Sequence, residues 1–207
     1  MPNRRERLLD AAIQVLGERG MRALTHRAVD AEAGVGAGST ANYFPTRESL
    51  LEAIVDRVSA MERDRFDEMA AEVCPATPAE LGRAIAGWVR EATGGRRVLT
   101  LSRYAILVEA GHNARIRHQL AQTGSRVNAW FANWLTLIGS VGTDRDVHVL
   151  GNYITGLMLH QLAMPDPGFD PADKITALIE SLVQPAGTPA RNSARHGVTG
   201  PARSNAL

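Results

Sequence analysis

The stretch that decides the fold runs from Gly34 to Leu50 and reads GVGAGSTANYFPTRESL. Three alternating glycines open it, small residues follow, and the aromatic pair Tyr43-Phe44 stands before Pro45. Such a stretch has two interpretations. One is a glycine-rich loop that cradles a phosphate group of a small ligand. The other is a short helix that lacks bulky side chains and can therefore lie against something large.

The residues before this stretch separate the two interpretations. A phosphate-binding glycine loop follows a strand and opens a helix, whereas residues 26–33 (HRAVDAEA) have a helical pattern and no lysine closes the motif. Thr25 is a typical N-cap, and Gly34 supplies the backbone freedom of a tight turn between helices. The order of helix, glycine turn and short helix predicts a helix-turn-helix.

Helical periodicity extends over the rest of the chain, and no segment alternates as a strand does. The predicted helices cover residues 4–19, 26–33, 37–43, 46–70, 77–93, 96–111, 113–140, 144–163 and 171–183. The predicted fold is therefore all-α. A three-helix helix-turn-helix domain over residues 1–48 precedes a helical bundle over 49–184. Residues 185–207 contain three arginines, no acid and almost no large apolar group, which predicts a disordered basic tail.

Composition limits the setting in which the protein works. The 207 residues carry a net charge of +1, with basic ends and an acidic middle, which fits an anionic partner near one terminus. The single cysteine, Cys74, excludes an internal disulfide and indicates a reducing compartment. The N-terminus has no apolar signal core, and the uncharged stretches 127–143 and 147–165 contain polar residues typical of bundle helices. We therefore expect a cytoplasmic protein that does not span a membrane.

The second helix of a helix-turn-helix enters the DNA major groove. Small residues at its start let the backbone approach a phosphate, and these are Gly36, Ala37, Gly38 and Ser39. Asn42 can pair with a base edge, and Thr40 and Ala41 can meet a thymine methyl group. Tyr43 and Arg47 suit phosphate contacts. The competing interpretation of residues 1–50 is a small helical subdomain with no role in DNA binding.

Residues 4–50 resemble the DNA-binding domain of TetR-family transcriptional repressors. The resemblance rests on RERLLDAAIQVLGERG, the Thr25 cap, AEAGV, GSTANYF and the run RESL at 47–50. It implies a homodimer, a C-terminal ligand-binding domain, and release of operator DNA when a ligand binds. By position, it implies that Thr25 bonds a phosphate and that Gly36, Ala37, Gly38 and Tyr43 contact DNA. Phe44 would pack in the core.

This chain departs from the family pattern at a few positions. Arg47 replaces the usual phosphate-binding lysine. Gly36 and Ala37 replace a serine and a polar residue, and Ala41 replaces a tyrosine. Fewer side chains therefore reach phosphates, so basic residues at the helix starts are expected to supply more of the affinity. These are Arg4, Arg5, His26 and Arg27.

The bundle region contains aromatic and apolar residues that suit a cavity for a hydrophobic effector. The candidates for its lining are Trp88, Tyr104, Val108, His112, Trp130, Trp134, Tyr153 and Met158. Plain core packing is the alternative. The last two helices are predicted to form a four-helix dimer interface through Leu150, Ile154, Leu157, Ile175, Leu178, Ile179 and Leu182. The alternative is packing of these faces within one subunit.

Other chemistry receives little support. Glu109 and His112 share a helix face, but a di-metal bundle site needs a second such pair, so no metal site is predicted and a polar contact is favoured. His118, His148 and His160 are isolated. No catalytic constellation and no cofactor motif is recognisable, and we expect no enzyme. The sequence predicts a repressor that leaves a palindromic operator when a small, mainly hydrophobic effector binds. The alternative is a helical ligand-binding protein whose DNA binding is weak or lost.

Overall fold

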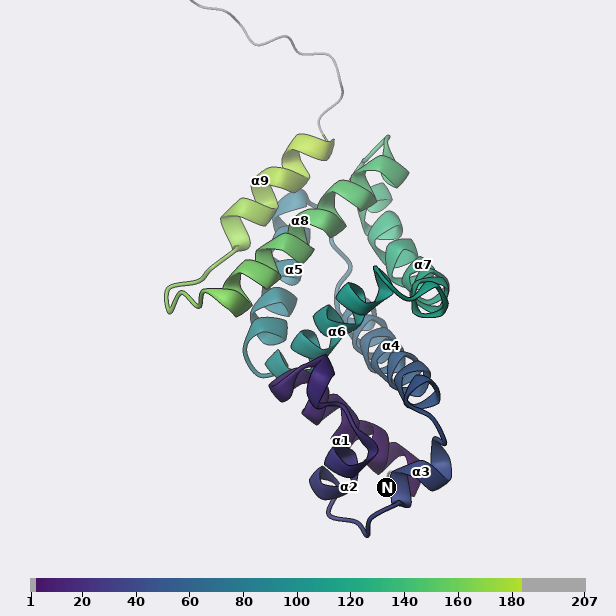
Figure 1. Cartoon of the computed structure of the whole chain (residues 1–207). Coiled ribbons are helices and arrows are strands. Elements are labelled where there is room, and N and C mark those ends of the chain that lie inside the picture. The colour runs from purple at the N-terminus through teal and green to yellow at the C-terminus, as the bar shows by residue number, and fades with distance from the viewer. Residues whose placement is uncertain (1–2, 184–207) are drawn as a thin grey trace, which may run out of the picture.

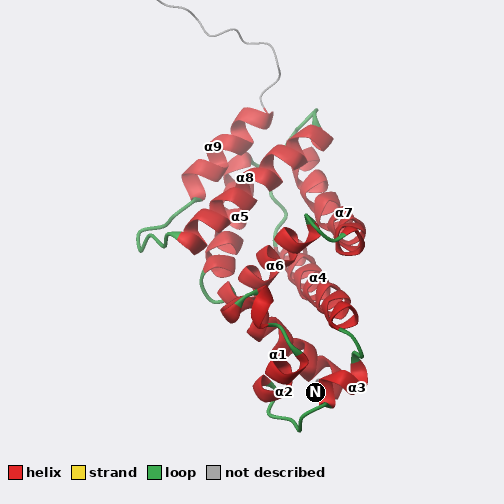
Figure 2. Cartoon of the chain, viewed as in Figure 1, coloured by secondary structure: helices red, strands yellow, loops and turns green. Residues whose placement is uncertain are grey.

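The computed structural model describes residues 3–183, apart from the side chains of Thr123, Ser125 and Arg126. This part of the chain is all-α, as predicted (Figures 1 and 2). The helices are α1 (Arg4–Arg19), η1 (Met21–Ala23), α2 (His26–Glu32), α3 (Ser39–Tyr43), α4 (Arg47–Glu72), α5 (Pro78–Thr93), α6 (Arg97–Ala110), α7 (Ala114–Leu137), α8 (Thr143–Ala163) and α9 (Ala172–Val183). The tail predicted for residues 185–207 lies outside the described residues.

Capping residues explain where several helices begin. Asn3 forms a capping box with Glu6 at the start of α1, and Thr46 forms one with Ser49 at the start of α4. Thr25 accepts a hydrogen bond from the Ala28 amide at the start of α2, over 3.1 Å. These side chains satisfy backbone amides that have no partner inside the helix.

Two helix boundaries differ from the prediction because of glycine conformation. The third helix was predicted from residue 37 but begins at Ser39, because Gly38 has φ +86° and lies outside the right-handed helical region. The helix predicted to reach residue 140 ends at Leu137, and Gly139 follows with φ +94°. Gly20, the C-cap residue of α1, has a positive φ of 78° but an extended ψ of 176°.

Two hydrophobic cores organise the molecule. The N-terminal core joins α1, α2 and the first half of α4 to α6 and the start of α7. The C-terminal core joins the second half of α4 to α5, α7, α8 and α9. In Figure 1, α2 and α3 lie at one end of the molecule and α9 at the other, with α4 and α6 between them. The boundary predicted at residue 48 falls at the start of α4, which continues without a break from one core into the other.

The contact between α1 and α6 is close because Gly17 has no side chain. A Cβ atom on Gly17 would lie 2.2 Å from the Val98 carbonyl oxygen. The close contact between α1 and α6 joins the N-terminal helices to α6. Both α6 and α4 therefore connect the N-terminal region to the rest of the chain.

Candidate DNA-binding surface and effector cavity

A buried carboxylate holds the third helix in place. Asp30, 4% exposed, accepts hydrogen bonds from the amides of Gly38 (2.8 Å) and Thr40 (2.7 Å) and from the Thr40 hydroxyl (2.5 Å). The N-cap residue of α3 is a glycine without a side chain, so Asp30 satisfies these donors from α2. Burial alone would raise the pKa of Asp30, but the hydrogen bonds from Thr40 and Gly38 outweigh it and hold the pKa below its ordinary value.

This arrangement corrects the role expected for Thr40. Its side chain is 0% exposed and faces Asp30, so it cannot meet a thymine methyl group. On a five-residue helix, the residue type alone does not show whether a polar side chain faces the solvent or the core. The hydrogen bonds between Thr40 and Asp30, which hold the side chain inward, could not be predicted from the sequence.

The other predicted DNA-contact residues form the outer surface of the helix-turn-helix. Tyr43 is 45% exposed. Also exposed are Thr25, Arg27, Gly36, Ala37, Gly38, Ala41, Asn42 and Arg47, while Ser39 and His26 are half-buried. The only residue of α3 that is fully buried in the described structure is therefore Thr40.

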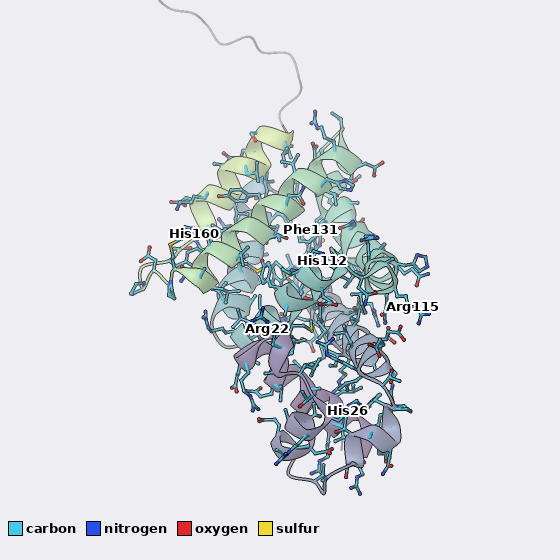
Figure 3. The ribbon with its side chains drawn as sticks, in the orientation of Figure 1. Arg22, His26, His112, Arg115, Phe131 and His160 are labelled. Atoms are coloured by element: carbon cyan, nitrogen blue, oxygen red, sulfur yellow. The ribbon has the colours of Figure 1, made fainter. Side chains whose placement is uncertain are left out.

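Several contacts orient this surface. The His26 Nε2 atom lies 2.6 Å from the Phe44 carbonyl oxygen, and Figure 3 shows His26 among the first helices. Phe44 is buried, as predicted, and Arg5 lies over its ring at 5.1 Å. Arg47 donates a hydrogen bond to the Met21 carbonyl over 3.1 Å. The end of α3 is thus tied to α1 and α2, and the start of α4 to η1.

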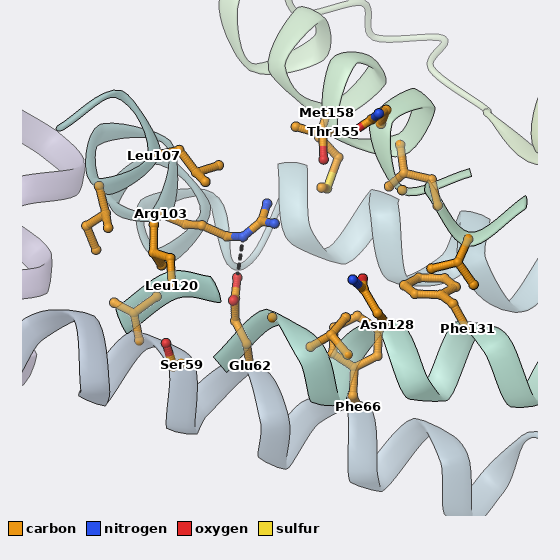
Figure 4. A pocket seen from close by; sticks show the side chains of 18 of the residues that line it. Ser59, Glu62, Phe66, Arg103, Leu107, Leu120, Asn128, Phe131, Thr155 and Met158 are labelled. Atoms are coloured by element: carbon orange, nitrogen blue, oxygen red, sulfur yellow. Dashed lines mark ion pairs between the residues drawn. The ribbon is translucent and has the colours of Figure 1, made fainter. Parts of the chain in front are cut away.

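A cavity of about 370 Å³ lies between α4, α5, α6, α7 and α8. Its wall is mainly apolar and includes Val55, Val58, Phe66, Trp88, Ile106, Leu107, Leu120, Val127, Phe131, Ile154 and Met158. Phe66 makes ring contacts with Trp88 at 5.1 Å and with Phe131 at 5.7 Å. Ser59, Asn128 and Thr155 add polar groups to the lining (Figure 4). This combination of apolar walls and few polar groups is typical of small-molecule sites.

An ion pair crosses the cavity. The Arg103 Nε atom on α6 lies 3.0 Å from a carboxylate oxygen of Glu62 on α4, and Figure 4 shows the pair among apolar side chains. The two side chains are 28% and 27% exposed, and both border the cavity. Burial raises the pKa of Glu62 although Arg103 opposes the shift.

Most residues predicted to line a pocket lie elsewhere. Trp88 and Met158 do border the cavity. Tyr104 and Trp134 are buried in the C-terminal core, and Tyr153 and Trp130 pack against it. Trp130 also donates to Asp67. Val108 is 70% exposed, and His112 is exposed beyond the end of α6.

Glu62 and Arg103 were not among the residues predicted to line a cavity, because Glu62 opens the charged run ERDR at 62–65, which is typical of a solvent-facing helix surface. A signal was available. Val55, Ser59, Glu62 and Phe66 follow one another at helical spacing, so Glu62 is an isolated acid within a stripe that otherwise faces inward. Tyr104, next to Arg103, donates from its hydroxyl to the Thr155 carbonyl over 2.5 Å, which ties α6 to α8.

Most of the predicted dimer contacts are buried within the subunit. Leu150, Ile154, Ile175 and Ile179 are at most 2% exposed, and Leu157, Leu178 and Leu182 pack partly buried against the same core. A Cβ atom on Gly82 of α5 would lie 2.1 Å from the Thr176 hydroxyl oxygen, so α9 is seated closely on its own subunit. The alternative of packing within one subunit therefore holds for the four buried residues.

The remaining candidates make no further site. His160 and His112 are not among the residues that line the cavity, while His148 borders it and His118 is exposed. Across residues 3–183, no three His, Cys, Asp or Glu side chains are placed to share a metal ion. Cys74 is exposed. None of the helices described has the length and apolarity of a membrane span.

Comparison with known proteins gives consistent matches. Residues 8–54 match the model of bacterial regulatory proteins of the tetR family, and residues 76–185 match the tetracyclin repressor-like C-terminal domain. The HTH-type transcriptional regulator BetI from Rhizobium meliloti (strain 1021) is 38% identical over 79 residues. That match spans 38% of this chain and 38% of the relative.

Solved structures extend the likeness over most of the chain. The multidrug binding protein EbrR, complexed with ethidium, is 27% identical with a TM-score of 0.67, covering 88% of this chain and 99% of that one. A transcriptional regulator from Rhodococcus sp. Rha1 shares the fold at a TM-score of 0.76 and 19% identity, covering 87% of this chain and 96% of that one. Because the C-terminal match alone covers more than half of the 207 residues, and the N-terminal match covers the helix-turn-helix, the chain belongs to the TetR family of transcriptional regulators.

Proposed function

We propose that this protein is a homodimeric repressor that binds a palindromic operator and leaves it when a small, mainly apolar effector enters the cavity. One observation carries the proposal. Helices α4 and α6 each belong both to the core that supports the helix-turn-helix and to the wall of the cavity. A change in the cavity therefore acts on the same two helices that hold the DNA-binding surface.

The exposed surface of α2 and α3 supports the DNA-binding part of the proposal. Gly36, Ala37 and Gly38 leave the backbone before α3 open to a phosphate, and the N-terminus of a helix favours an anion. Asn42 and Tyr43 are exposed and long enough to reach a base edge and a phosphate, respectively.

The outer face of α8 supports dimerisation. Val149 and Leu159 are exposed apolar side chains, and Gly156 between them is exposed without a side chain. These positions allow close packing of two helices across a two-fold axis. A dimer would place two copies of α3 at the spacing of one DNA turn, about 34–36 Å.

The effector would act by population shift. A ligand that fits the cavity better in one relative position of α4 and α6 shifts the dimer away from the DNA-bound spacing. Ligand and operator then oppose each other with a coupling free energy of about 1–3 kcal/mol, as is typical of such linkage. The EbrR structures with ethidium and proflavin support an aromatic small molecule as the kind of effector.

The test of DNA binding uses fluorescence anisotropy with duplexes from the region upstream of the protein's own coding sequence. We expect salt-dependent binding by the wild type. The substitutions Tyr43→Ala and Arg47→Ala should each weaken binding on all sequences, because each removes one phosphate contact. Only Arg47→Ala should also reduce the salt slope, by about 1, because it removes a positive charge. Glu48→Ala, an exposed neighbour of Arg47, is the control. Unchanged affinity and slope in both variants would contradict the assigned contacts.

The test of dimerisation is Leu159→Glu, measured by analytical ultracentrifugation. We expect the variant to sediment as a monomer and to lose most of its operator affinity, because the two half-sites are no longer linked. Val108→Glu introduces the same charge at another exposed apolar position, on α6, and should remain dimeric. A dimeric Leu159→Glu variant would exclude this face as the interface.

The second candidate function is a ligand-binding protein without DNA binding. The inward direction of Thr40 and the small side chains at Gly36, Ala37 and Ala41 favour it, because they reduce the number of side chains that can reach DNA. Effector binding to the cavity combined with no salt-dependent binding to any duplex would support this candidate.

A further inference from the structure

The hydrogen-bonding needs of Arg103 are not met by the described part of the protein. A guanidinium carries five N–H donors and stays charged at every relevant pH. Its one recorded acidic partner is Glu62, which it meets through Nε at 3.0 Å. The Nη1 atom is buried and has no hydrogen-bond partner among the described residues. Because a buried donor without an acceptor is costly, such groups normally have a partner.

We propose that the effector carries an anionic acceptor group, such as a carboxylate, on an aromatic or apolar body, and that Arg103 binds this group. This inference rests on the proposed function, since it concerns the effector of the same cavity. The acceptor would meet the guanidinium at its Nη atoms, where the fork geometry of arginine suits a carboxylate. The body would lie against the aromatic wall that Phe66, Trp88 and Phe131 form.

The opposite charge fits the cavity less well. A cationic ligand would pair with Glu62 and thereby compete with Arg103 for its one recorded acidic partner. The guanidinium, whose Nη1 atom is buried, would then lose its acidic partner Glu62, and it cannot lose its proton. An anionic ligand leaves no comparable problem. Burial already raises the pKa of Glu62, so this carboxyl can become neutral when the ligand's anion takes over Arg103.

The position of the pair gives this charge preference a route to the DNA-binding surface. Glu62 is on α4 and Arg103 is on α6, the two helices that also support the helix-turn-helix. The ion pair holds them together across the cavity (Figure 4). An anionic effector that binds Arg103 would break its ion pair with Glu62 and loosen the link between α4 and α6. The same contact would then serve effector binding and the release of DNA.

The test uses three fluorescent probes, each with a flat three-ring aromatic body of similar size. They are 9-anthracenecarboxylate, which is anionic, 9-anthracenemethanol, which is neutral, and proflavin, which is cationic. Dissociation constants are measured by fluorescence titration at pH 7 without DNA. We expect wild-type protein to bind the carboxylate at least about tenfold more tightly than the alcohol, which corresponds to one good charge-assisted contact. Proflavin should bind more weakly than the carboxylate.

Substitutions assign the preference to Arg103. Arg103→Met retains the apolar stem and should bind the carboxylate and the alcohol about equally. Glu62→Gln should retain the preference for the carboxylate. Arg65→Met is the matched control, because it removes a guanidinium that pairs with Glu91 outside the cavity lining. Circular dichroism melts identify any variant that does not fold, and the wild-type comparison of the three probes needs no variant.

Specific outcomes would overturn the proposal. These are equal binding of the carboxylate and the alcohol by the wild type, tighter binding of proflavin that Glu62→Gln abolishes, or no binding of any probe. A separate operator-release assay distinguishes this inference from the proposed function. Arg103-dependent binding of the carboxylate without release of DNA would leave the inference standing while the proposed function failed.

Discussion

The helix-turn-helix and the cavity each contain an inward-facing carboxylate, and folding shifts the pKa of the two carboxylates in opposite directions. Asp30 accepts three hydrogen bonds from α3 and the turn before it, and its pKa is lowered. Glu62 meets one guanidinium nitrogen, and its pKa is raised. The first is a completed structural contact. The second leaves the Nη1 donor of Arg103 without a hydrogen-bond partner among the described residues, beside the cavity. This is expected where a ligand supplies the missing acceptor.

The comparison shows how one small chain separates a rigid part from a responsive part. Backbone amides held at fixed distances by a buried acid favour one arrangement of α3. The Glu62–Arg103 ion pair is a single contact between two long side chains. A ligand can therefore replace it more easily than it could replace the three hydrogen bonds of Asp30. We expect the polar network of the first region to support stability, and that of the second to support selectivity.

The largest effect is expected from Asp30→Ala. It leaves the amides of Gly38 and Thr40 and the Thr40 hydroxyl without their acceptor, and unsatisfied buried donors cost about 1–3 kcal/mol each. We expect a loss of roughly 3 kcal/mol in the free energy of unfolding, measured with urea, together with loss of DNA binding. Glu48→Ala, which removes an exposed acid, should change stability by less than about 0.5 kcal/mol. Equal stability of the two variants would remove the role assigned to Asp30.

A smaller effect is expected at the contact that joins the two regions. Gly17→Ala places a Cβ atom 2.2 Å from the Val98 carbonyl oxygen, which forces α1 away from α6 and should cost about 1–3 kcal/mol. Effector-induced release of DNA should weaken with it. The control is Gly87→Ala on α5, where a Cβ atom has no neighbour within 4 Å, and which should stabilise the protein by up to about 1 kcal/mol. If both variants release DNA as the wild type does, the α1–α6 contact does not transmit the signal.

The smallest effect is expected in the dependence of stability on pH, and it has opposite signs for the two acids. The pKa of Asp30 is lowered by folding, so its contribution is present above the unfolded value of about 3.9 and is lost as the pH falls through the folded pKa. The pKa of Glu62 is raised by folding. Its contribution therefore decreases as the pH rises from the unfolded value of about 4.3 through the folded pKa.

Urea unfolding at a series of pH values measures both signs. Relative to the wild type, Glu62→Gln should gain stability as the pH rises above about 4.3. Asp30→Asn should lose stability relative to the wild type at lower pH, as the pH rises from the folded pKa of Asp30 to about 3.9. Parallel pH profiles for the two variants would show that the two carboxyls do not differ as described.

Local signals in the sequence accounted for the helices and for most of the exposed residues of the helix-turn-helix. Caps at Thr25 and Thr46, the turn at Gly34 and the apolar spacing of α1 and α4 act within a few residues of the chain, so they can be read without a structure. The exposed positions of Asn42, Tyr43 and Arg47 belong to the same local pattern. Their contacts with DNA remain predictions.

Which helix faces meet depends on how the whole molecule packs. Periodicity shows that Leu150 and Ile175 lie on apolar faces, but it does not show whether such a face meets another helix of the same subunit or a second copy. In the same way, nothing local shows that Asp30 reaches Thr40, or that Glu62 faces Arg103 across a cavity. Signals within the sequence were enough to predict the helices, the resemblance to the TetR family and most of the exposed residues of the helix-turn-helix. The three-dimensional packing decided the cavity and its charges, because contacts between distant residues depend on the arrangement of whole helices.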